Sequence, residues 1–265
     1  MITIIIPVYN GERYIADAIN SLLRQSYTDL EILVINDASI DSTHNVVSSF
    51  SDSRIREVVN ERNVGAGMSR RIGTQLASGE YIMFLDADDM YRDNFVSDMY
   101  SYAVKYDSEL VTSESLTQLL NDGTMIDSSP VFVNNSIIST DLFRSGKVEY
   151  CGRRYIEDTP TFYQLECSAR NPIVVKNNGY IYRENELSLT HTSSFVKETI
   201  YGYWCSYDIE RYSEKFGKPL PDYVPSRCYL ANLVARGVTY KDIEPYMDDC
   251  PAELTSAMRE KFALE

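Results

Sequence analysis

The stretch ITIIIPVYNGERYIADAINSLL, residues 2–23, decides the fold class because it joins two hydrophobic periods in one short unit. Its first part is an almost continuous apolar run from Ile4 to Val8, as in a strand that is buried on both faces. From Tyr14 onward, apolar residues recur at i, i+1, i+4, i+5, i+8 and i+9, which is the period of an amphipathic helix. The unit therefore predicts a buried strand followed by an amphipathic helix.

Three more units of the same kind follow within the first hundred residues. Strands are expected at 32–35, 55–59 and 81–85. The helix after each strand is marked by its apolar positions, which are Val46, Val47 and Phe50, then Met68, Ile72 and Leu76, then Phe95, Met99 and Tyr102. Buried strands that alternate with helices predict an α/β fold, with a mostly parallel sheet that carries helices on both faces.

Beyond Tyr106 this alternation is lost. The local elements expected there are a strand at 110–112, a turn at 121–123, and a hairpin tip at Asn177, Asn178 and Gly179 before a strand at 180–182. From Thr192 onward the pattern is mostly helical. We therefore divide the chain into residues 1–105, residues 106–190 and a C-terminal helical extension over residues 191–265.

Charge and composition disfavour several classes of protein. The net charge is −14 and the basic residues are scattered, which argues against a nucleic-acid partner. The five cysteines are odd in number and never in C-x-x-C spacing, as expected of free thiols in a reducing cytoplasm. We recognise no signal peptide and no apolar stretch of the ~18 residues that a membrane span needs. The expected location is the cytoplasm, and any contact with a membrane would be peripheral.

Polar segments follow three of the expected strands: PVYN at 7–10, NDASIDST at 36–43 and DADD at 86–89. Ligands of open α/β sheets bind at the carboxyl ends of the strands, so these segments mark the expected site. No G-x-G-x-x-G follows the first strand, and G-x-x-x-x-G-K-[ST] does not occur. These absences argue against dinucleotide enzymes and P-loop NTPases.

Asp86, Asp88 and Asp89 place three carboxylates within four residues at a strand end, and their mutual repulsion calls for a cation. Hard oxygen ligands suit Mg²⁺ or Mn²⁺ that substrate phosphates also bind. An EF-hand loop is excluded because Tyr91 stands where that loop requires glycine. The alternative is that Asp88 or Asp89 caps the following helix.

Three further segments carry candidate chemistry. Asp37 ends the second strand and can accept a hydrogen bond from a ligand N–H. Residues 63–71 combine glycines with Arg70 and Arg71 at a helix start, a place suited to an anion or to a plain surface helix. The third segment is an acidic pair before a helix, in which Thr159 would be the N-cap and Pro160 the first helical residue: Glu157, Asp158, Thr159 and Pro160.

Together these pieces resemble the family 2 glycosyltransferases of the GT-A fold. Five motifs carry the resemblance and occur in the family's order: IIPVYN at 5–10, NDAS-x-D-x-T at 36–43, N-x-G through Ser69-Arg70 at 63–70, GEYI-x-FLD-x-DD at 79–89, and Glu157-Asp158. The resemblance is strong to about residue 100, moderate to about residue 190 and weak thereafter.

The resemblance implies a Rossmann-like sheet whose first part, residues 1–105, binds a nucleotide sugar, while residues 106–190 bind the acceptor and carry catalysis. It implies that Asp37 bonds the edge of uracil and that Asp88 holds Mn²⁺ or Mg²⁺ on the diphosphate. The nucleotide-binding residues that it implies are Pro7, Tyr9, Asp37, Asn63, Arg70 and Asp86.

Asp158 matches the general base of inverting members of this family. A sugar hydroxyl is a poor nucleophile until a carboxylate takes its proton, and one displacement at the anomeric carbon inverts its configuration. His191 is a candidate third metal ligand or phosphate contact, with a structural role as the alternative. Arg71 departs from the family, which usually has asparagine there, so its contact is not assigned.

The resulting hypothesis is a metal-dependent inverting transferase that moves a sugar from a UDP-sugar to a sugar or other hydroxyl-bearing acceptor, in polysaccharide or glycoconjugate synthesis. The alternatives are a nucleotidyltransferase and a non-catalytic nucleotide-sugar-binding module. Trp204 could stack on an acceptor sugar, although core packing is the simpler role. The last helix has an apolar stripe that would pack on its own domain or form a homodimer: Leu254, Met258 and Phe262.

Overall fold

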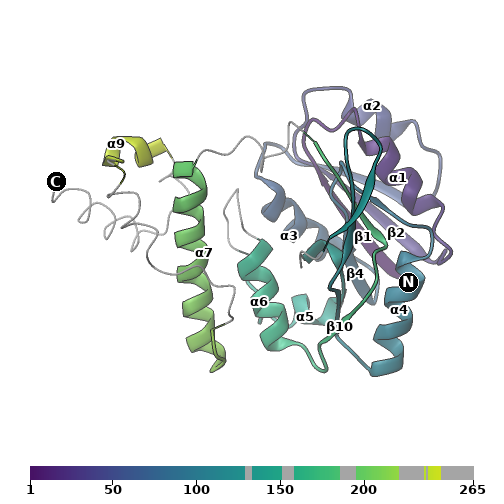
Figure 1. The fold of residues 1–265 in the computed structure, drawn as a ribbon. Helices are drawn as coiled ribbons and strands as arrows, with labels where there is room; N and C mark the ends of the chain where they lie inside the picture. Colours follow the sequence, from purple (N-terminus) through teal and green to yellow (C-terminus); the bar gives the residue numbers. More distant parts are fainter. Residues whose placement is uncertain (129–132, 151–157, 186–194, 221–235, 237, 246–265) are drawn as a thin grey trace.

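A seven-stranded sheet lies at the centre of the computed structural model, which describes residues 1–128, 133–150, 158–185, 195–220, 236 and 238–245 (Figure 1). Its strand order is β10-β6-β9-β4-β1-β2-β3, and β9 alone runs antiparallel to its two neighbours. The elements of the first half are β1 Ile2–Val8, α1 Ile15–Leu23, β2 Leu30–Asn36, α2 Thr43–Ser48, β3 Ile55–Val59, α3 Ala66–Leu76, β4 Tyr81–Phe84, β5 Met90–Tyr91 and α4 Phe95–Tyr106. The predicted α/β class is confirmed, as are its four repeated units.

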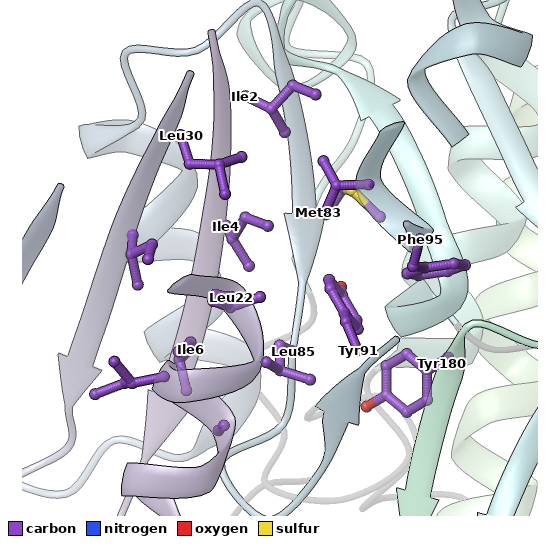
Figure 2. Close-up of a cluster of buried hydrophobic side chains, with 14 of the residues drawn as sticks. Ile2, Ile4, Ile6, Leu22, Leu30, Met83, Leu85, Tyr91, Phe95 and Tyr180 are labelled. Atoms are coloured by element: carbon purple, nitrogen blue, oxygen red, sulfur yellow. The ribbon is translucent and has the colours of Figure 1, made fainter. Parts of the chain in front are cut away.

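The strands are buried on both faces, as their apolar runs predict. Alternate residues of β1 enter different cores: Ile4 and Ile6 pack with α1 and α4 on one face, while Ile5 packs with α3, α5 and α6 on the other. Figure 2 shows the first of these cores, in which Leu22 of α1 covers the strands. The period of two along the strand therefore builds a three-layer arrangement of helices, sheet and helices.

Helix α3 approaches the sheet more closely than its apolar pattern predicts. Its buried face consists mainly of small residues and Arg70, while the predicted apolar positions of α3 are only half-buried. A Cβ added to Gly73 would lie 2.5 Å from Cγ2 of Ile5, so only glycine fits against this strand. The close approach brings Arg70 under the carboxyl edge of the sheet.

A second sheet, of four strands in the order β5-β11-β7-β8, was not foreseen from the sequence. The elements of this half are β6 Leu110–Ser113, β7 Leu116–Leu119, β8 Met125–Ser128, the 3₁₀ turn η1 Val133–Asn135, β9 Ser136–Ser139, α5 Thr140–Arg144, α6 Asp158–Ser168, β10 Ile173–Val175 and β11 Tyr180–Arg183. The predicted turn at 121–123 joins β7 to β8 and has Gly123 at φ 85°.

The hairpin predicted at Asn177, Asn178 and Gly179 is wrong. This segment joins β10, which pairs with β6 in the large sheet, to β11, which pairs with β5 and β7 in the small sheet. A turn-forming sequence between two strands does not state which partner each strand pairs with, because pairing depends on distant residues. The connection carries the chain from one sheet to the other.

Strand register brings four loops to one edge of the large sheet. Val8 of β1 lies beside Asn36 of β2, and Asn36 lies beside Val59 of β3. Ile5 of β1 lies beside Phe84, the last residue of β4. The segments that leave β1, β2, β3 and β4 therefore start side by side.

Two helices complete the described part: α7 Phe195–Phe216 and the short α9 Tyr240–Ile243. Helix α7 packs on α6 through a cluster that includes Tyr163, Cys205 and Ile209. Trp204 is fully buried, which favours its core-packing role.

The predicted apolar stripe of the last helix lies outside the described residues. Within the described part, no helix combines the length and hydrophobicity needed to cross a bilayer.

Candidate active site

The loops after β1 and β2 are fastened to each other at the carboxyl edge. Asn10 donates its N–H to Oγ of Ser39 at 3.0 Å, and its Oδ1 accepts the N–H of Ile40 at 2.9 Å. Asn10 and Ala38 both have left-handed backbones, with φ of 52° and 59°, which residues other than glycine adopt rarely. These hydrogen bonds join the two loops to each other.

Pro7 and Tyr9, expected near the nucleotide base, lie in different environments. Pro7 is buried within β1, whereas Tyr9 starts the following loop with 48% of its surface exposed. An exposed aromatic ring at the mouth of the sheet can stack on a base.

Asp37 organises the turn that leads into α3. Its Oδ1 accepts hydrogen bonds from Nδ2 of Asn60 at 2.8 Å and from the N–H of Val64 at 2.9 Å, while Oδ2 accepts the N–H of Gly65 at 2.7 Å. Gly65 has φ 90°, a conformation that favours glycine. Asn63 lies half-buried in the same turn. Because each carboxylate oxygen can accept two hydrogen bonds, Oδ2 keeps the capacity for a bond to a nucleotide base.

Asp86 is held from two sides. Nη2 of Arg70, on α3, donates to Oδ1 at 2.7 Å, and Nδ2 of Asn134, in η1, donates to Oδ2 at 2.6 Å. Since a carboxylate only accepts, the amide of Asn134 must turn its NH₂ toward Asp86 and its oxygen away. That oxygen is buried and accepts no hydrogen bond within the described residues. The Asp86 side chain keeps 33% of its surface exposed and can still contact a ligand.

Asp88 and Asp89 are bonded to strand β11 and the residues that follow it. Nδ2 of Asn185 donates to Oδ2 of Asp88 at 2.9 Å. The hydroxyl of Tyr180 donates to Oδ2 of Asp89 at 2.5 Å, and the N–H of Arg183 donates to Oδ1 of Asp89 at 2.8 Å. Neither aspartate serves as the helix cap considered from the sequence, because α4 begins at Phe95 with Asn94 before it.

Burial controls the ionisation of these two acids. Burial raises the pKa of Asp88 above its usual value, and the negative charge of Asp86 adds to this, while the bond from Asn185 opposes it. Burial raises the pKa of Asp89 further, with added repulsion from Asp88 and Asp86. A cation beside Asp88 would favour its ionised form.

The oxygen atoms at this edge fit a hard divalent cation. Asp86 and Asp88 supply partly exposed carboxylates at this edge. The part of the chain that the structure describes holds no group of three or more His, Cys, Asp or Glu placed to ligate a metal. Mg²⁺ and Mn²⁺ sites of the substrate-bridging kind need only one or two carboxylates, because phosphates and water complete the shell.

Asp158 is the first residue of α6, so the predicted helix start is shifted. Thr159 and Pro160 lie inside the first turn and are not the N-cap and first residue, and Oδ1 of Asp158 accepts the N–H of Thr159 at 2.9 Å. Proline is tolerated in the first turn of a helix, so Pro160 does not determine which residue begins it. Glu157 and His191 lie outside the described residues.

The topology places the start of α6 near the acidic edge. The end of this helix is tied to the opposite edge, where the Arg170 N–H donates to Oε2 of Glu109, just before β6. A helix of 11 residues spans about 16 Å, comparable to the strands, so its start lies toward the carboxyl edge. Helix α6 also packs on η1, which carries Asn134.

Four residues of this arrangement were missed from the sequence: Asn60, Asn134, Tyr180 and Asn185. Each is an ordinary polar or aromatic residue outside the recognised motifs, and each reaches the site through contacts between distant parts of the chain. Only Asn60 carried a local signal, since it directly follows a predicted strand. The other three required the positions of η1 and β11.

A mostly parallel sheet with an acidic carboxyl edge is typical of enzymes that bind a nucleotide together with a metal, a class that includes sugar transferases and nucleotidyltransferases. Comparison with known families distinguishes between these two. The model of the family described as "Glycosyl transferase family 2" matches residues 3–145, more than half of the chain. The chain belongs to glycosyl transferase family 2 and is a glycosyltransferase. Membership of this family excludes the nucleotidyltransferase alternative and supports sugar transfer.

A relative from Escherichia coli agrees with this assignment. The chain is 44% identical over 94 residues to the UDP-Glc:alpha-D-GlcNAc-diphosphoundecaprenol beta-1,3-glucosyltransferase WfgD of Escherichia coli, a match that covers 36% of this chain and 37% of that protein. The chain thus aligns with little more than a third of the length of this relative.

Two of the similar solved structures illustrate the shared GT-A fold. S. aureus TarS 1-349 in complex with UDP-GlcNAc superposes with a TM-score of 0.73 at 18% identity, over 94% of this chain and 79% of that one. The mannosyltransferase PcManGT of Pyrobaculum calidifontis, in complex with GDP-Man and Mn2+, superposes with a TM-score of 0.60 at 14% identity, over 99% and 83% of the two chains.

Proposed function

We propose that the chain transfers a sugar from a UDP-sugar to an acceptor hydroxyl, with inversion and with Mn²⁺ or Mg²⁺, at the carboxyl edge of the large sheet. The observation that carries this proposal is the meeting of Asp37, the Arg70–Asp86 pair and Asp88 at one edge. The UDP-sugar complex of TarS and the UDP-Glc in the name of WfgD support the choice of uridine. In this proposal residues 1–105 bind the donor, and residues 106–190 bind the acceptor and carry the base.

The base and ribose would lie over the loops after β1 and β2. Tyr9 offers an exposed ring for the base, and Asp37 offers the remaining acceptor position on Oδ2 for the uracil N–H. Asn63 belongs to the turn that Asp37 organises and is proposed to contact the nucleotide. Asp86, which Arg70 orients, accepts a hydrogen bond from a ribose hydroxyl. Because hydrogen bonds join the loops after β1 and β2, the nucleotide can bind with little loss of conformational entropy in the protein.

Asp88 is the proposed metal ligand, and the Mn²⁺ complex of PcManGT supports the use of a divalent cation by a protein of this fold. When bound, the cation neutralises the charge that develops on the departing diphosphate. Nδ2 of Asn185 donates to Oδ2 of Asp88, and Oδ1 is the proposed ligand atom. His191 stays a candidate ligand from the segment after β11.

Asp158 is the proposed general base. Its carboxylate takes the proton of the acceptor hydroxyl as that oxygen attacks the anomeric carbon. The bond between this carbon and the diphosphate oxygen breaks, and UDP leaves with the electron pair. A single displacement inverts the anomeric configuration, since no enzyme nucleophile intervenes.

The acceptor is proposed only by class, as a sugar or another hydroxyl-bearing group in polysaccharide or glycoconjugate synthesis. The net charge of −14 disfavours large nucleic-acid surfaces as acceptors. A cytoplasmic location with peripheral membrane contact, and a homodimer, remain predictions from the sequence.

Release of UDP from a panel of UDP-sugars, with and without Mn²⁺, tests this proposal. We expect one or a few UDP-sugars to be hydrolysed slowly in the absence of acceptor, with metal required. Proton NMR of the first sugar anomer released then reports inversion. Release from GDP-sugars with none from UDP-sugars would overturn the choice of donor, and a retained configuration would overturn the single displacement.

A further inference from the structure

Asp89 belongs to the acidic cluster but faces away from the proposed donor site. Only 1% of its surface is exposed, and both of its oxygens are bonded to strand β11, by the Tyr180 hydroxyl and the Arg183 N–H. Asp86 and Asp88, in contrast, are only partly buried. Asp89 is therefore the member of the cluster least able to touch a ligand.

The partner of Asp89 is itself rigidly placed. The Tyr180 ring packs edge-on against Tyr91 with centroids 5.6 Å apart, and Tyr91 packs in the same way against Phe95 at 4.8 Å. Figure 2 shows the three rings grouped at one end of the core. The hydroxyl that reaches Asp89 thus projects from a packed aromatic group in the small sheet and α4.

The position of Asp89 also sets the positions of the other two acids. Its N–H donates to the carbonyl oxygen of Asp86 at 3.0 Å, which closes a turn over residues 86–89. Asp88 lies inside this turn and is bonded to Asn185, two residues beyond β11. The hydrogen bonds that hold Asp89 against β11 therefore also hold the turn that contains Asp86 and Asp88.

We propose that Asp89 is a positioning residue, which locks the acidic turn onto β11 through Tyr180 and Arg183 so that Asp86 and Asp88 face the donor. The inference rests on the proposed function for what Asp86 and Asp88 bind. It assigns Asp89 no contact with donor or metal. Outer residues of this kind change metal affinity by about 10–100-fold when they are removed.

The nature of the Asp89 contacts makes a charge-free replacement informative. In Asp89→Asn, the amide oxygen can still accept the Arg183 N–H, and the NH₂ can donate to the Tyr180 oxygen, because a hydroxyl both donates and accepts. This variant keeps the two hydrogen bonds to β11 and removes the negative charge of Asp89. Asp89→Ala removes the hydrogen bonds and the charge. Tyr180→Phe removes only the hydrogen bond from the Tyr180 hydroxyl and leaves the rest of the core unchanged.

The first measurement is Mn²⁺ affinity by calorimetry in the presence of UDP, on the full chain. We expect Asp89→Asn to bind Mn²⁺ within about threefold of wild type, Tyr180→Phe to bind it several-fold more weakly, and Asp89→Ala to lose about 10–100-fold. Tyr81→Phe is the matched control, since that hydroxyl contacts the Ser108 carbonyl at the far edge of the sheet. A loss in Asp89→Asn as large as in Asp88→Asn would overturn the positioning role, because charge or ligation would then be what matters.

The second measurement is hydrogen exchange of the metal-free chain, which does not depend on the proposed function. We expect Tyr180→Phe to speed exchange in peptides that cover residues 85–91, about ninety positions away in sequence, with no such effect in Tyr81→Phe. Unchanged exchange there would overturn the inference, even where Asp89→Ala fails to fold. Failure of the wild type to bind Mn²⁺ would count against the proposed metal site alone, and the exchange result would still decide the role of Asp89.

Discussion

Arg70 and Asp86 form an ion pair, 2.7 Å between Nη2 and Oδ1, that joins helix α3 to the loop after β4. Arg70 is buried beneath the carboxyl edge, while a third of the Asp86 side chain remains exposed. The small residues of α3, Gly73 among them, permit this geometry because they let the helix approach the sheet. The pair thus connects the packing of the core with the orientation of a site carboxylate.

Replacing Arg70 by alanine should weaken UDP binding by about tenfold or more, because a hydrogen bond to a charged group contributes about 1.5–3 kcal/mol. Calorimetric titration of UDP measures this. Arg71→Ala is the matched control, since Arg71 is exposed on the same helix. Equal losses in the two variants would mean that general electrostatic attraction, and not the ordering of Asp86, holds the nucleotide.

Asp37→Ala should weaken uridine nucleotides by about 1–3 kcal/mol and also destabilise the chain, because three N–H donors lose their acceptor. Titration of UDP and urea unfolding follow the two effects separately. Asn60→Ala, which removes one of the three donors, should reproduce part of the stability loss and less of the binding loss. Unchanged UDP affinity in a folded Asp37→Ala chain would remove Asp37 from the base pocket.

Asp158→Asn should lower turnover by about 10²–10⁴-fold while UDP binding and stability stay near wild type. Asparagine can still accept the Thr159 N–H at the start of α6, but it cannot take a proton from an acceptor. Measured turnover and melting temperature therefore separate a base from a cap. Near-normal turnover would transfer the role of base to another residue, with Glu157 the next candidate.

Gly73→Ala should destabilise the fold by about 1–2 kcal/mol, although alanine is the better helix former. The added methyl group would meet Cγ2 of Ile5, which is part of a buried central strand and cannot move aside cheaply. Urea unfolding measures the change, with Gln75→Ala on the exposed face of α3 as control. A gain in stability would show that α3 does not approach β1 as closely as described.

Periodicity predicted the first half of the fold because its strands and helices are local and repeated, so neighbours in sequence are also neighbours in space. The second sheet could not be predicted in the same way. Its strand β11 pairs with β5 and β7, elements with which it shares no local pattern, and the turn-forming residues before it suggested a hairpin. Pairing of this kind is decided by tertiary contacts.

The same distinction holds in the site. Asp37, Asp86 and Asp88 stand in motifs at strand ends, Arg70 stands in a motif at a helix start, and all four could be selected from the sequence. Their hydrogen-bond partners, such as Asn134 for Asp86, come from other segments of the chain. No short sequence pattern predicts where these segments lie in the fold. Sequence therefore selected the groups that are proposed to carry the chemistry, and the structure added the contacts that hold them in place.

The central claim is that this edge binds a uridine diphosphate together with a divalent cation through Asp88. Calorimetric titration of UDP and of GDP, each with Mn²⁺ and with a chelator, tests it most directly in wild type and in Asp88→Ala. The account predicts that UDP binds more tightly than GDP, that Mn²⁺ strengthens UDP binding in wild type, and that Asp88→Ala erases this gain. Equal affinity for UDP with and without Mn²⁺, or a preference for GDP, would contradict it.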